Sequence, residues 1–449
     1  MASDVEKAFT VLSAKQAAYR DLFNYYDGDQ PLMYTARRLE EIFRGLDARF
    51  TQNWCAVVVD AVKDRINLRK IAVTGSQAAQ WADLWERSEL FLESDDCHEA
   101  LLVAGEGFVI VDNDGQAYYN DPRLAQVFYD AANPRLKRWA AKWWVNDEGF
   151  LRMALYYPDR VLNYVSVKAA DKTDLKATDI VEMAGNDFMQ ANPLGQVPVF
   201  HFRQSRRIVK SDLKSVLPIQ NGINKLLSDM MVAAEFGAFK QRWVISNAEI
   251  QGKLKNAPGE VWDIPSGDGM GQQTQVGQFE ANELKNYLNG IEQAANACAS
   301  ITRTPKHYFF SIGSNLSGEA LMAMEAPLVK KAQDRIDRAA PVWKAVAELM
   351  LFAVSGVMPA PGDVKPEFDG TGVVQPRTEA ETRGLNVQAG MPLETVLRDE
   401  GKSVEYIEQM QRDRAADAKR QQVSLGQSLL DAQRRFDIGG QNNGHSQPQ

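Results

Sequence analysis

Residues 317–354 read SGEALMAMEAPLVKKAQDRIDRAAPVWKAVAELMLFAV. Ser317 is a residue type that caps helix N-termini, and Glu319 in the first turn is favoured by the helix dipole. The apolar residues that then recur every three or four positions on one helical face are Leu321, Met324, Leu328, Ala332, Ile336, Ala339, Trp343, Val346 and Met350. The pattern predicts one long helix. We expect kinks at Pro327 and Pro341, because an interior proline loses a hydrogen bond and clashes with the preceding turn.

Similar apolar periodicity predicts further helices on both sides of this one. The helical segments expected are residues 3–26, 53–66, 77–94, 211–240, 281–301, 379–400 and 403–436. Ser211-Asp212 is a good N-cap pair for one of them, although Pro218 places its true start nearer to that proline. Gly390-Met391-Pro392 interrupts another.

Residues 100–210 have a different pattern. Asp112-Asn113-Asp114-Gly115 follows an apolar run and predicts a hairpin turn. Short apolar runs separated by Asp, Asn, Gly or Pro follow at 125–129, 138–144, 151–157 and 160–167, and Pro198 is expected at a sheet edge. These runs predict an antiparallel sheet. The expected fold class is therefore α+β, mainly helical.

The composition limits the classes of function. The 449-residue chain has a formal net charge of −8, and it lacks the basic run that would suggest a grip on DNA phosphates. Cys55, Cys97 and Cys298 are far apart and odd in number, which argues against a disulfide scaffold or a zinc site and fits a reducing cytoplasm. The N-terminal residues lack the pattern of a signal peptide, and no run of about 18 apolar residues predicts a membrane span.

The sequence motifs of common catalytic sites are absent. There is no GxxxxGK[ST], no HExxH and no GxSxG. Gly267-Asp268-Gly269-Met270-Gly271 lacks the last glycine of GxGxxG, because Gln272 stands there, so a flexible loop is expected. We expect no cofactor, no metal and no catalytic residue.

Some residue types would nevertheless suit other chemistry. His98 stands between Cys97 and Glu99 and could bind a metal, but we expect this triplet on a helix surface. Asp95-Asp96 and Asp112/Asp114 are expected at a helix terminus and in a turn. Converging acids would also serve a two-metal nuclease.

Aromatic residues cluster at 139–144 and at Tyr156-Tyr157. Such residues can form stacking platforms for single-stranded nucleic acid. On a sheet they more often form core or subunit contacts, and this is what we expect here.

Six motifs follow one another in order along the chain. They are Tyr25-Tyr26-Asp27-Gly28; Asn53 to Arg65, with Val59 and Asp60; Gly105 to Val109; Asn192 to Val199; Ser211-Asp212-Leu213 with Asn224 to Asp229; and Thr304-Pro305 with Ser317 to Leu321. No single motif is specific. As an ordered set, spanning roughly residues 20 to 420, they resemble the portal family of long-tailed, siphovirus-type bacteriophages.

The resemblance implies a portal fold whose subunits form a ring with wing, stem, clip and crown regions. It assigns residues 1–210 to an N-terminal wing, 211–240 and 281–301 to two stem helices, 241–280 to the clip, 302–316 to a tunnel loop, 317–354 to a long kinked helix, 355–402 to a C-terminal wing, 403–437 to a crown helix and 438–449 to a disordered tail.

The resemblance also implies the function. A dodecameric ring at one capsid vertex of the virion, assembled in the host bacterial cytoplasm, would pass double-stranded viral DNA during packaging and ejection. The implied partners are other copies of the chain, the large terminase subunit, head-tail connector or adaptor proteins, and the major capsid and scaffolding proteins. In this family the packaging ATPase belongs to the terminase, which agrees with the absent P-loop.

Three groups of residues are candidate contacts under this resemblance. Tunnel-loop residues for DNA phosphates are Arg303, Lys306 and His307, although these could instead cap helix ends or bridge subunits. Channel-facing stem residues are Lys225, Asp229, Glu235, Glu283, Lys285 and Glu292. Clip residues for partner proteins are Trp243, Lys253, Lys255 and Trp262. Ten acids and seven bases between Ser211 and Thr302 make a mildly acidic mixture that should let DNA slide.

Two other functions remain open on the sequence. One is a ring-forming scaffold with no DNA role. The other is a metal-dependent DNA-processing enzyme within residues 95–210, whose DNA cleavage would be abolished by Asp112→Ala or Asp114→Ala.

Overall fold

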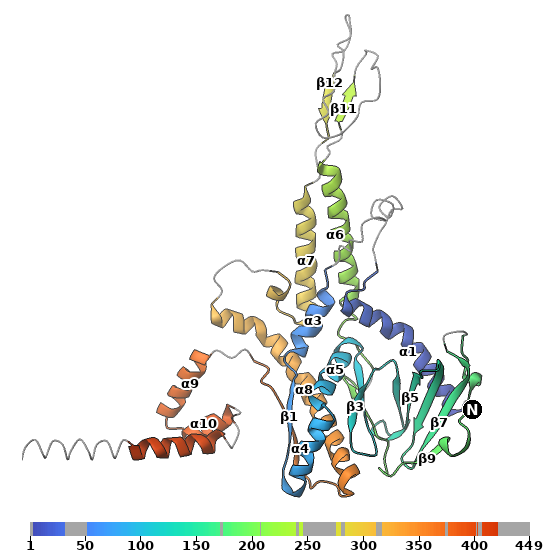
Figure 1. Ribbon diagram of the computed structural model, residues 1–449. Coiled ribbons are helices and arrows are strands. Elements are labelled where there is room, and N and C mark those ends of the chain that lie inside the picture. Colours follow the sequence, from blue (N-terminus) through green and yellow to red (C-terminus); the bar gives the residue numbers. More distant parts are fainter. Residues whose placement is uncertain are drawn as a thin grey trace, which may run out of the picture. The chain divides into compact units, whose positions relative to one another are not determined.

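The structure is a computed structural model, and it describes residues 3–31, 52–170, 174–206, 208–238, 242–245, 275–279, 283–310, 317–372, 376–400, 402 and 406–420. The chain divides into two compact units, Met1–Gly372 and Val373–Gln449. Figure 1 traces both units along the sequence.

The long helix α8 (Gly318–Ser355; Figure 1) contributes side chains to two hydrophobic cores of the first unit. The Oγ of Ser317 caps it by accepting a hydrogen bond from the Ala320 amide at 3.2 Å. The helix runs through Pro327 and Pro341 and ends at Gly356, which has a φ of 70°. The predicted long helix and its cap are thus confirmed.

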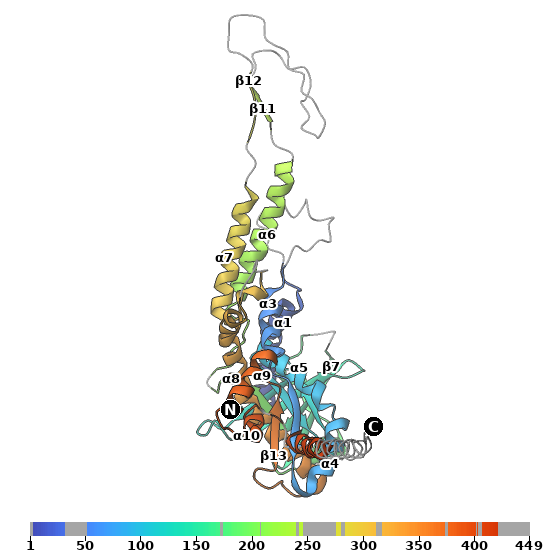
Figure 2. The ribbon, with the colours of Figure 1, turned by 90° about the vertical axis from the view of Figure 1, so that its left-hand side faces the viewer.

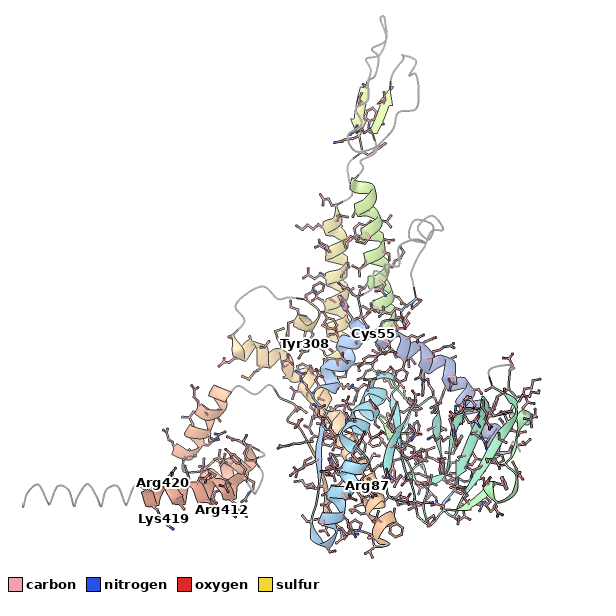
Figure 3. All side chains as sticks on the ribbon, in the orientation of Figure 1. Cys55, Arg87, Tyr308, Arg412, Lys419 and Arg420 are labelled. Atoms are coloured by element: carbon pink, nitrogen blue, oxygen red, sulfur yellow. The ribbon has the colours of Figure 1, made fainter. Side chains whose placement is uncertain are left out.

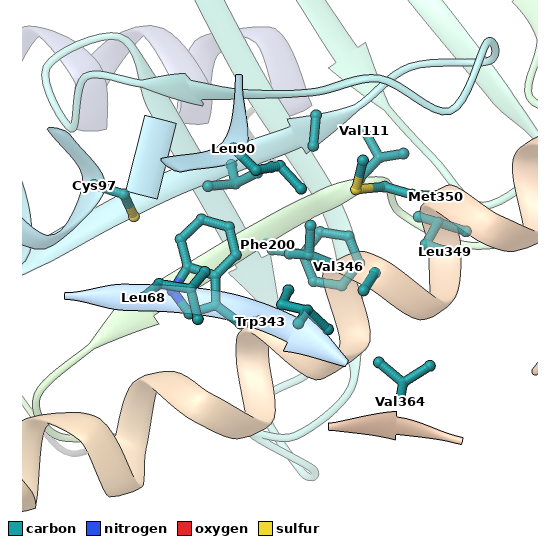
Figure 4. Packing of buried hydrophobic residues seen from close by; sticks show 14 of the residues in the cluster. Leu68, Leu90, Cys97, Val111, Phe200, Trp343, Val346, Leu349, Met350 and Val364 are labelled. Atoms are coloured by element: carbon teal, nitrogen blue, oxygen red, sulfur yellow. The ribbon is translucent and has the colours of Figure 1, made fainter. Parts of the chain in front are cut away.

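The C-terminal half of α8 packs into the first core (Figure 4). Trp343 is fully buried, and its ring lies 4.7 Å from that of Phe202. The helices and strands that close this core around α8 include α4 (Ala78–Arg87), α5 (Leu90–Val103), β1 (Leu68–Val73) and β13 (Val364–Phe368).

The N-terminal half of α8 enters the second core. Leu328 and Ala332 are fully buried there, beside residues of α3 (Trp54–Lys63), α6 (Leu217–Ala238) and α7 (Leu284–Thr302). Figures 1 and 2 show α6 and α7 side by side. β11 (Arg242–Ile245) and β12 (Gln275–Gln278), which lie between them in the sequence, pair antiparallel.

Two antiparallel sheets occupy residues 106–203. The smaller has the order β10-β2-β3 and consists of β2 (Glu106–Val111), β3 (Ala117–Asn120) and β10 (Val199–Arg203). The larger consists of β4 (Ala125–Tyr129), β5 (Lys137–Val145), β6 (Phe150–Tyr156), β7 (Arg160–Ala169) and β8 (Ile180–Glu182) in chain order, and β9 (Met189–Ala191) also pairs with β7. The predicted antiparallel strands are confirmed, and Pro198 directly precedes the edge strand β10.

Helix α1 (Asp4–Asp27) covers one face of the larger sheet, where Ala8 and Leu12 meet Trp143 and Met153. Trp139 and Trp143 are only 5% and 7% exposed. The expectation of core contacts is therefore confirmed for these two tryptophans, whereas Trp144 is 37% exposed. The chain also forms short 3-10 helices η1 (Gly75–Gln77), η2 (Ala177–Asp179) and η3 (Gly185–Asp187).

One predicted helix is wrong. Residues 77–94 do not form a single helix, because Glu89 takes a left-handed conformation, with a φ of 44°, between α4 and α5. Asp95-Asp96 consequently lie inside α5 and not at a helix terminus.

The predicted surface position of His98 is also wrong. Cys97 is fully buried and His98 is 2% exposed. The His98 Nε2 accepts a hydrogen bond from the Trp343 indole at 2.9 Å. Cys97 and His98 are therefore part of the core, while Glu99 is partly exposed and pairs with Lys63 at 2.7 Å.

The predicted cap of α6 needs a similar correction. The Oγ of Ser211 accepts a hydrogen bond from the Leu213 amide at 3.0 Å, so Ser211 stabilises a turn before the helix. α6 begins at Leu217, with Pro218 in its first turn. The start near Pro218 is therefore confirmed.

The second unit contains α9 (Pro376–Gln388), α10 (Leu393–Asp399) and a helix over 406–420. Gly390, with a φ of 96°, separates α9 from α10, which confirms the break expected there. Arg383 and Glu400 form an ion pair at 2.7 Å. The expected remainder of the last helix and the tail lie outside the described residues.

Candidate functional site

The chain turns sharply where α7 ends. Arg303 follows α7 with a φ of 60°, and its amide closes the helix by donating to the Ala299 carbonyl. A non-glycine residue pays roughly 1 kcal/mol for this left-handed conformation. The side chain of Arg303 is exposed. An exposed arginine thus occupies a position whose backbone would favour glycine.

The next residues form a short anchored loop. Thr304 is 2% exposed, and η4 (Lys306–Tyr308) begins after Pro305. Lys306 is exposed. The predicted tunnel-loop cations Arg303 and Lys306 therefore both reach solvent. Residues 311–316 lie outside the described part of the chain.

His307 has a different environment from these two cations. Its Nε2 lies 2.8 Å from a carboxylate oxygen of Glu325 on α8. Glu325 is nearly buried and also pairs with Arg65 at 2.9 Å, while Arg65 donates to the Tyr308 hydroxyl at 2.8 Å. Figure 3 labels Tyr308 where α7 approaches α3 and α8. This network holds the loop against α3 and α8, so the contacts of His307 are those of an anchor.

A polar cavity of about 310 Å³ lies beside Arg303. Its charged lining residues are Lys210, Asp212, Arg303, Lys331, Asp334 and Arg335. Four of these groups are basic and two are acidic. The cavity therefore has an excess of positive charge.

The floor of this cavity is a buried ion network. Asp212 lies 3.2 Å from Lys331 and 2.9 Å from Arg335, which are one turn apart on α8. Burial opposes the charge of Asp212, but the two cations outweigh it and lower the pKa of this carboxyl. Burial lowers the pKa of Lys331, and Asp212 opposes that shift. The network fixes α8 to the segment that leads into α6.

The predicted stem residues lie on α6 and on α7, with Glu283 directly before α7. Lys225 and Asp229 form an ion pair one turn apart on α6 and are half-buried. Glu283, Lys285 and Glu292 are exposed. The side chain of Glu235 is outside the described residues.

Three of the four predicted clip residues, Lys253, Lys255 and Trp262, lie outside the described part of the chain. Trp243 on β11 is half-buried. Its indole covers Gly277 on β12, where an added Cβ would approach the ring to 2.4 Å. Gly277 is therefore required by close packing within the hairpin.

The sequence did not predict that five residues of the site form two ion networks. They are Arg65, Asp212, Glu325, Lys331 and Arg335. Lys331 and Arg335 have helical i, i+4 spacing, which indicates a shared face. Their partner Asp212 is over a hundred residues away, so spacing alone did not connect them.

The described residues offer neither a metal site nor a membrane span. Within them, no group of three or more His, Cys, Asp or Glu side chains could hold a metal ion. None of the described helices is long and apolar enough to span a bilayer. Asp112 instead stabilises its turn by accepting hydrogen bonds from the amides of Asp114 and Gln116.

Comparison of the sequence with known proteins gives matches of one kind. A family model described as "Phage portal protein, SPP1 Gp6-like" matches residues 13–418. Portal proteins of Mycobacterium phages D29 and L5 are each 28% identical to the chain over 148 residues, or 30% of it. These alignments span 30% of the D29 protein and 29% of the L5 protein.

Two of the solved structures that the chain matches come from gene transfer agent particles. One is from the neck of an empty particle computed with C6 symmetry, with 11% identity, a TM-score of 0.42, and coverage of 79% of this chain and 89% of the other. Another is from the virion of a native particle, with 12% identity, a TM-score of 0.42, and coverage of 80% and 90%.

Proposed function

The chain belongs to the SPP1 Gp6-like family of phage portal proteins, and on this basis we propose that copies of it assemble into a dodecameric ring at one capsid vertex, through which the viral genome is packaged and ejected. The observation that carries the proposal is the length of the family match. Residues 13–418 include nearly every described element, from α1 to the helix over 406–420.

The apolar face of α7 supports assembly into a ring. Ile291, Ala295 and Cys298 lie on this face and are buried. Leu284 and Leu288 continue the same face toward the helix start, where they are 38% and 54% exposed. An adjacent copy that covered these leucines would extend the core across subunits, and repeated head-to-tail contacts of this kind close into a ring.

The loop after α7 supports contact with DNA. Arg303 and Lys306 are exposed, while the Glu325 network holds the loop in place. Cations on an anchored loop can contact phosphates of any sequence, because phosphate contacts carry no base information. Charged side chains of both signs on α6 and α7 would let the DNA slide.

The hairpin β11–β12 is the surface that we propose for docking the terminase during packaging and the connector proteins afterwards. Ile245, Val276 and Phe279 are 55%, 57% and 59% exposed. The register places Ile245 and Val276 on opposite faces of the hairpin, so each face offers an exposed apolar side chain to a partner.

Capsid and scaffolding proteins are the partners proposed for the wing. The ring itself is proposed as a conduit without catalytic activity.

Neutralising the loop cations tests the DNA contact. We expect Arg303→Gly with Lys306→Gln to leave ring assembly intact, because Gly accepts the backbone conformation of residue 303 and both side chains are exposed. The amount of DNase-protected DNA per particle should fall in cells in which the variant supplies the portal. Arg87→Gln, an exposed charge change on α4, is the control and should have no effect. Unchanged DNA retention in the double variant would refute the contact while leaving ring formation unaffected.

A further inference from the structure

The larger sheet has one face that α1 does not cover. Trp143, Met153 and Tyr164 contact the α1 side. Side chains alternate along each strand, so the neighbours Trp144, Arg152 and Val165 point to the opposite face. The register pairs Trp144 with Arg152, Arg152 with Val165, and Val165 with Val181. One arginine is thus set in a row of apolar side chains across β5, β6, β7 and β8.

This row borders a cavity of about 330 Å³, a volume within the range of small-ligand pockets. Trp144, Arg152 and Asn163 line it from the strands, and Met183 and Gln190 line it from the segment after β8. The apolar surface continues around it, since Trp144 and Val181, which lie on the same face of the sheet, are 37% and 41% exposed. The cavity could therefore accept one large apolar side chain.

Arg152 lines the cavity and has no carboxylate partner among the described residues. Its guanidinium contacts the Met183 sulfur at 3.0 Å, and a thioether is a weak acceptor. Among the described residues, no carboxylate oxygen lies within 4.0 Å of this guanidinium. Asp187 also lines the cavity, but its backbone carbonyl is occupied by Asn163 at 2.9 Å and its side chain is not paired with Arg152. A planar guanidinium with unused donors is suited to bidentate binding of a carboxylate.

We propose that this row and cavity bind an extended segment of another protein in which a carboxylate side chain stands beside a large apolar side chain. Arg152 receives the carboxylate, and the apolar side chain enters between Trp144 and Met183. Asn163 and Gln190 supply polar groups at the cavity wall for the backbone of the segment. The site is separate from α7, the loop at Arg303 and the hairpin β11–β12, so it stands independently of the proposed DNA path.

A random heptapeptide library displayed on a carrier particle, selected on the purified wild-type protein and counter-selected on Arg152→Gln, tests the proposal. We expect the enriched peptides to share an Asp or Glu next to an aromatic or large aliphatic residue. A synthetic peptide of the enriched sequence should lose about tenfold or more in affinity on Arg152→Gln, the loss of one charge-assisted hydrogen-bonded pair. Arg152→Lys should bind with intermediate affinity, because it keeps the charge but not the planar pair of donors.

The matched control is Arg69→Gln, which removes an exposed arginine from β1 and should leave peptide affinity unchanged. Thermal melting of each variant checks that the fold is intact. Three results would overturn the proposal: no enrichment over the starting library, enriched peptides that bind Arg152→Gln equally well, or a preference of the same site for a single-stranded oligonucleotide over the acidic peptide.

Discussion

Glu106 lies at the start of β2, where three elements meet. It is 1% exposed, its carboxylate pairs with Lys15 of α1, and its other oxygen lies 2.8 Å from the His201 Nε2 on β10. The Tyr19 hydroxyl also donates to Glu106 at 2.8 Å. Burial raises the pKa of Glu106, but the hydrogen bond with His201 and the charge of Lys15 outweigh it and lower the pKa to about 2. The carboxylate is therefore ionised and connects α1 to the smaller sheet.

Removing the charge of Glu106 should strongly destabilise the first unit. Glu106→Gln leaves the ammonium of Lys15 buried without its counter-ion, and breaking a buried pair in this way costs roughly 3–5 kcal/mol. We expect a correspondingly lower denaturant midpoint by circular dichroism. The double variant Glu106→Gln with Lys15→Met should regain part of the lost stability, because it no longer buries an unpaired charge. A Glu106→Gln protein as stable as the wild type would show that this ion pair does not stabilise the fold.

His98 should make the stability of the subunit depend on pH. Burial lowers the pKa of His98 to about 4, against about 6.5 for an exposed histidine. The unfolded chain therefore binds a proton between these values and the folded chain does not. The contribution of His98 to the free energy of unfolding is therefore complete above pH 6.5 and is lost as the pH falls through 4. This loss is at most roughly 3 kcal/mol.

Denaturant midpoints of the wild type and His98→Gln between pH 7 and pH 4 measure this contribution. Gln keeps an acceptor for the Trp343 indole but does not titrate in this range. The difference between the denaturant midpoints of the wild type and His98→Gln should become smaller as the pH falls. Only the wild type loses the stability that a neutral, buried His98 provides. A gap that stays constant over the whole range would contradict the assignment.

At the residue scale, sequence reasoning found exposed charges more readily than paired ones. Arg303 and Lys306 were chosen as basic residues of the tunnel loop that the portal resemblance implies, and both are exposed. The partnership of Asp212 with Lys331 and Arg335 depends on the packing of α8 against the turn before α6, which no local pattern encodes. His98 was misplaced for a related reason: nearby residues in the sequence include the acids Asp96 and Glu99, but its neighbour in space is Trp343.

At the element scale, α8 joins two hydrophobic cores. Leu328 and Ala332 lie in one, and Ala339, Trp343 and Val346 lie in the other. Both cores depend on one helical register, because the apolar residues of both halves share a face.

Inserting Gly-Gly after Ala332 should therefore prevent assembly. Two added residues rotate the following part of the helix by about 200°, which moves Trp343 and Val346 out of the first core. We expect aggregated or unfolded protein and no rings by negative-stain microscopy. The same insertion after the exposed Gly370 is the control and should be tolerated. Normal rings from the α8 variant would show that its register is not required.

The elements that sequence patterns predicted well are those with local signals. Ser317 and the apolar stripe marked α8, and turn residues marked the strands β4 to β7. The break between α4 and α5 was missed because Glu89, not glycine, takes the left-handed conformation. The pairing of β1 with β13 was missed because it joins residues 68–73 to residues 364–368, and the second segment lies in a stretch rich in Pro and Gly.

At the scale of the whole molecule, the family match assigns a portal protein and the described residues show surfaces that one copy leaves open. These are the exposed leucines at the start of α7, the hairpin β11–β12 and the part of the larger sheet around Trp144 and Arg152. The acidic net charge of −8 is consistent with a conduit that does not hold DNA tightly. A ring that covers Leu284 and Leu288 and exposes Arg303 to DNA accounts for these features together.

The most direct test of this account is negative-stain microscopy of the purified protein, with light scattering on the same sample. The account predicts rings with a central hole and a mass many times the 50.1 kDa of one chain. Leu288→Glu should shift the scattering mass toward that of one chain without loss of helical content, because a carboxylate would be buried at the subunit contact. A wild-type protein that scatters as a single 50.1 kDa species at every concentration up to its solubility limit, with no rings on the grid, would contradict the account.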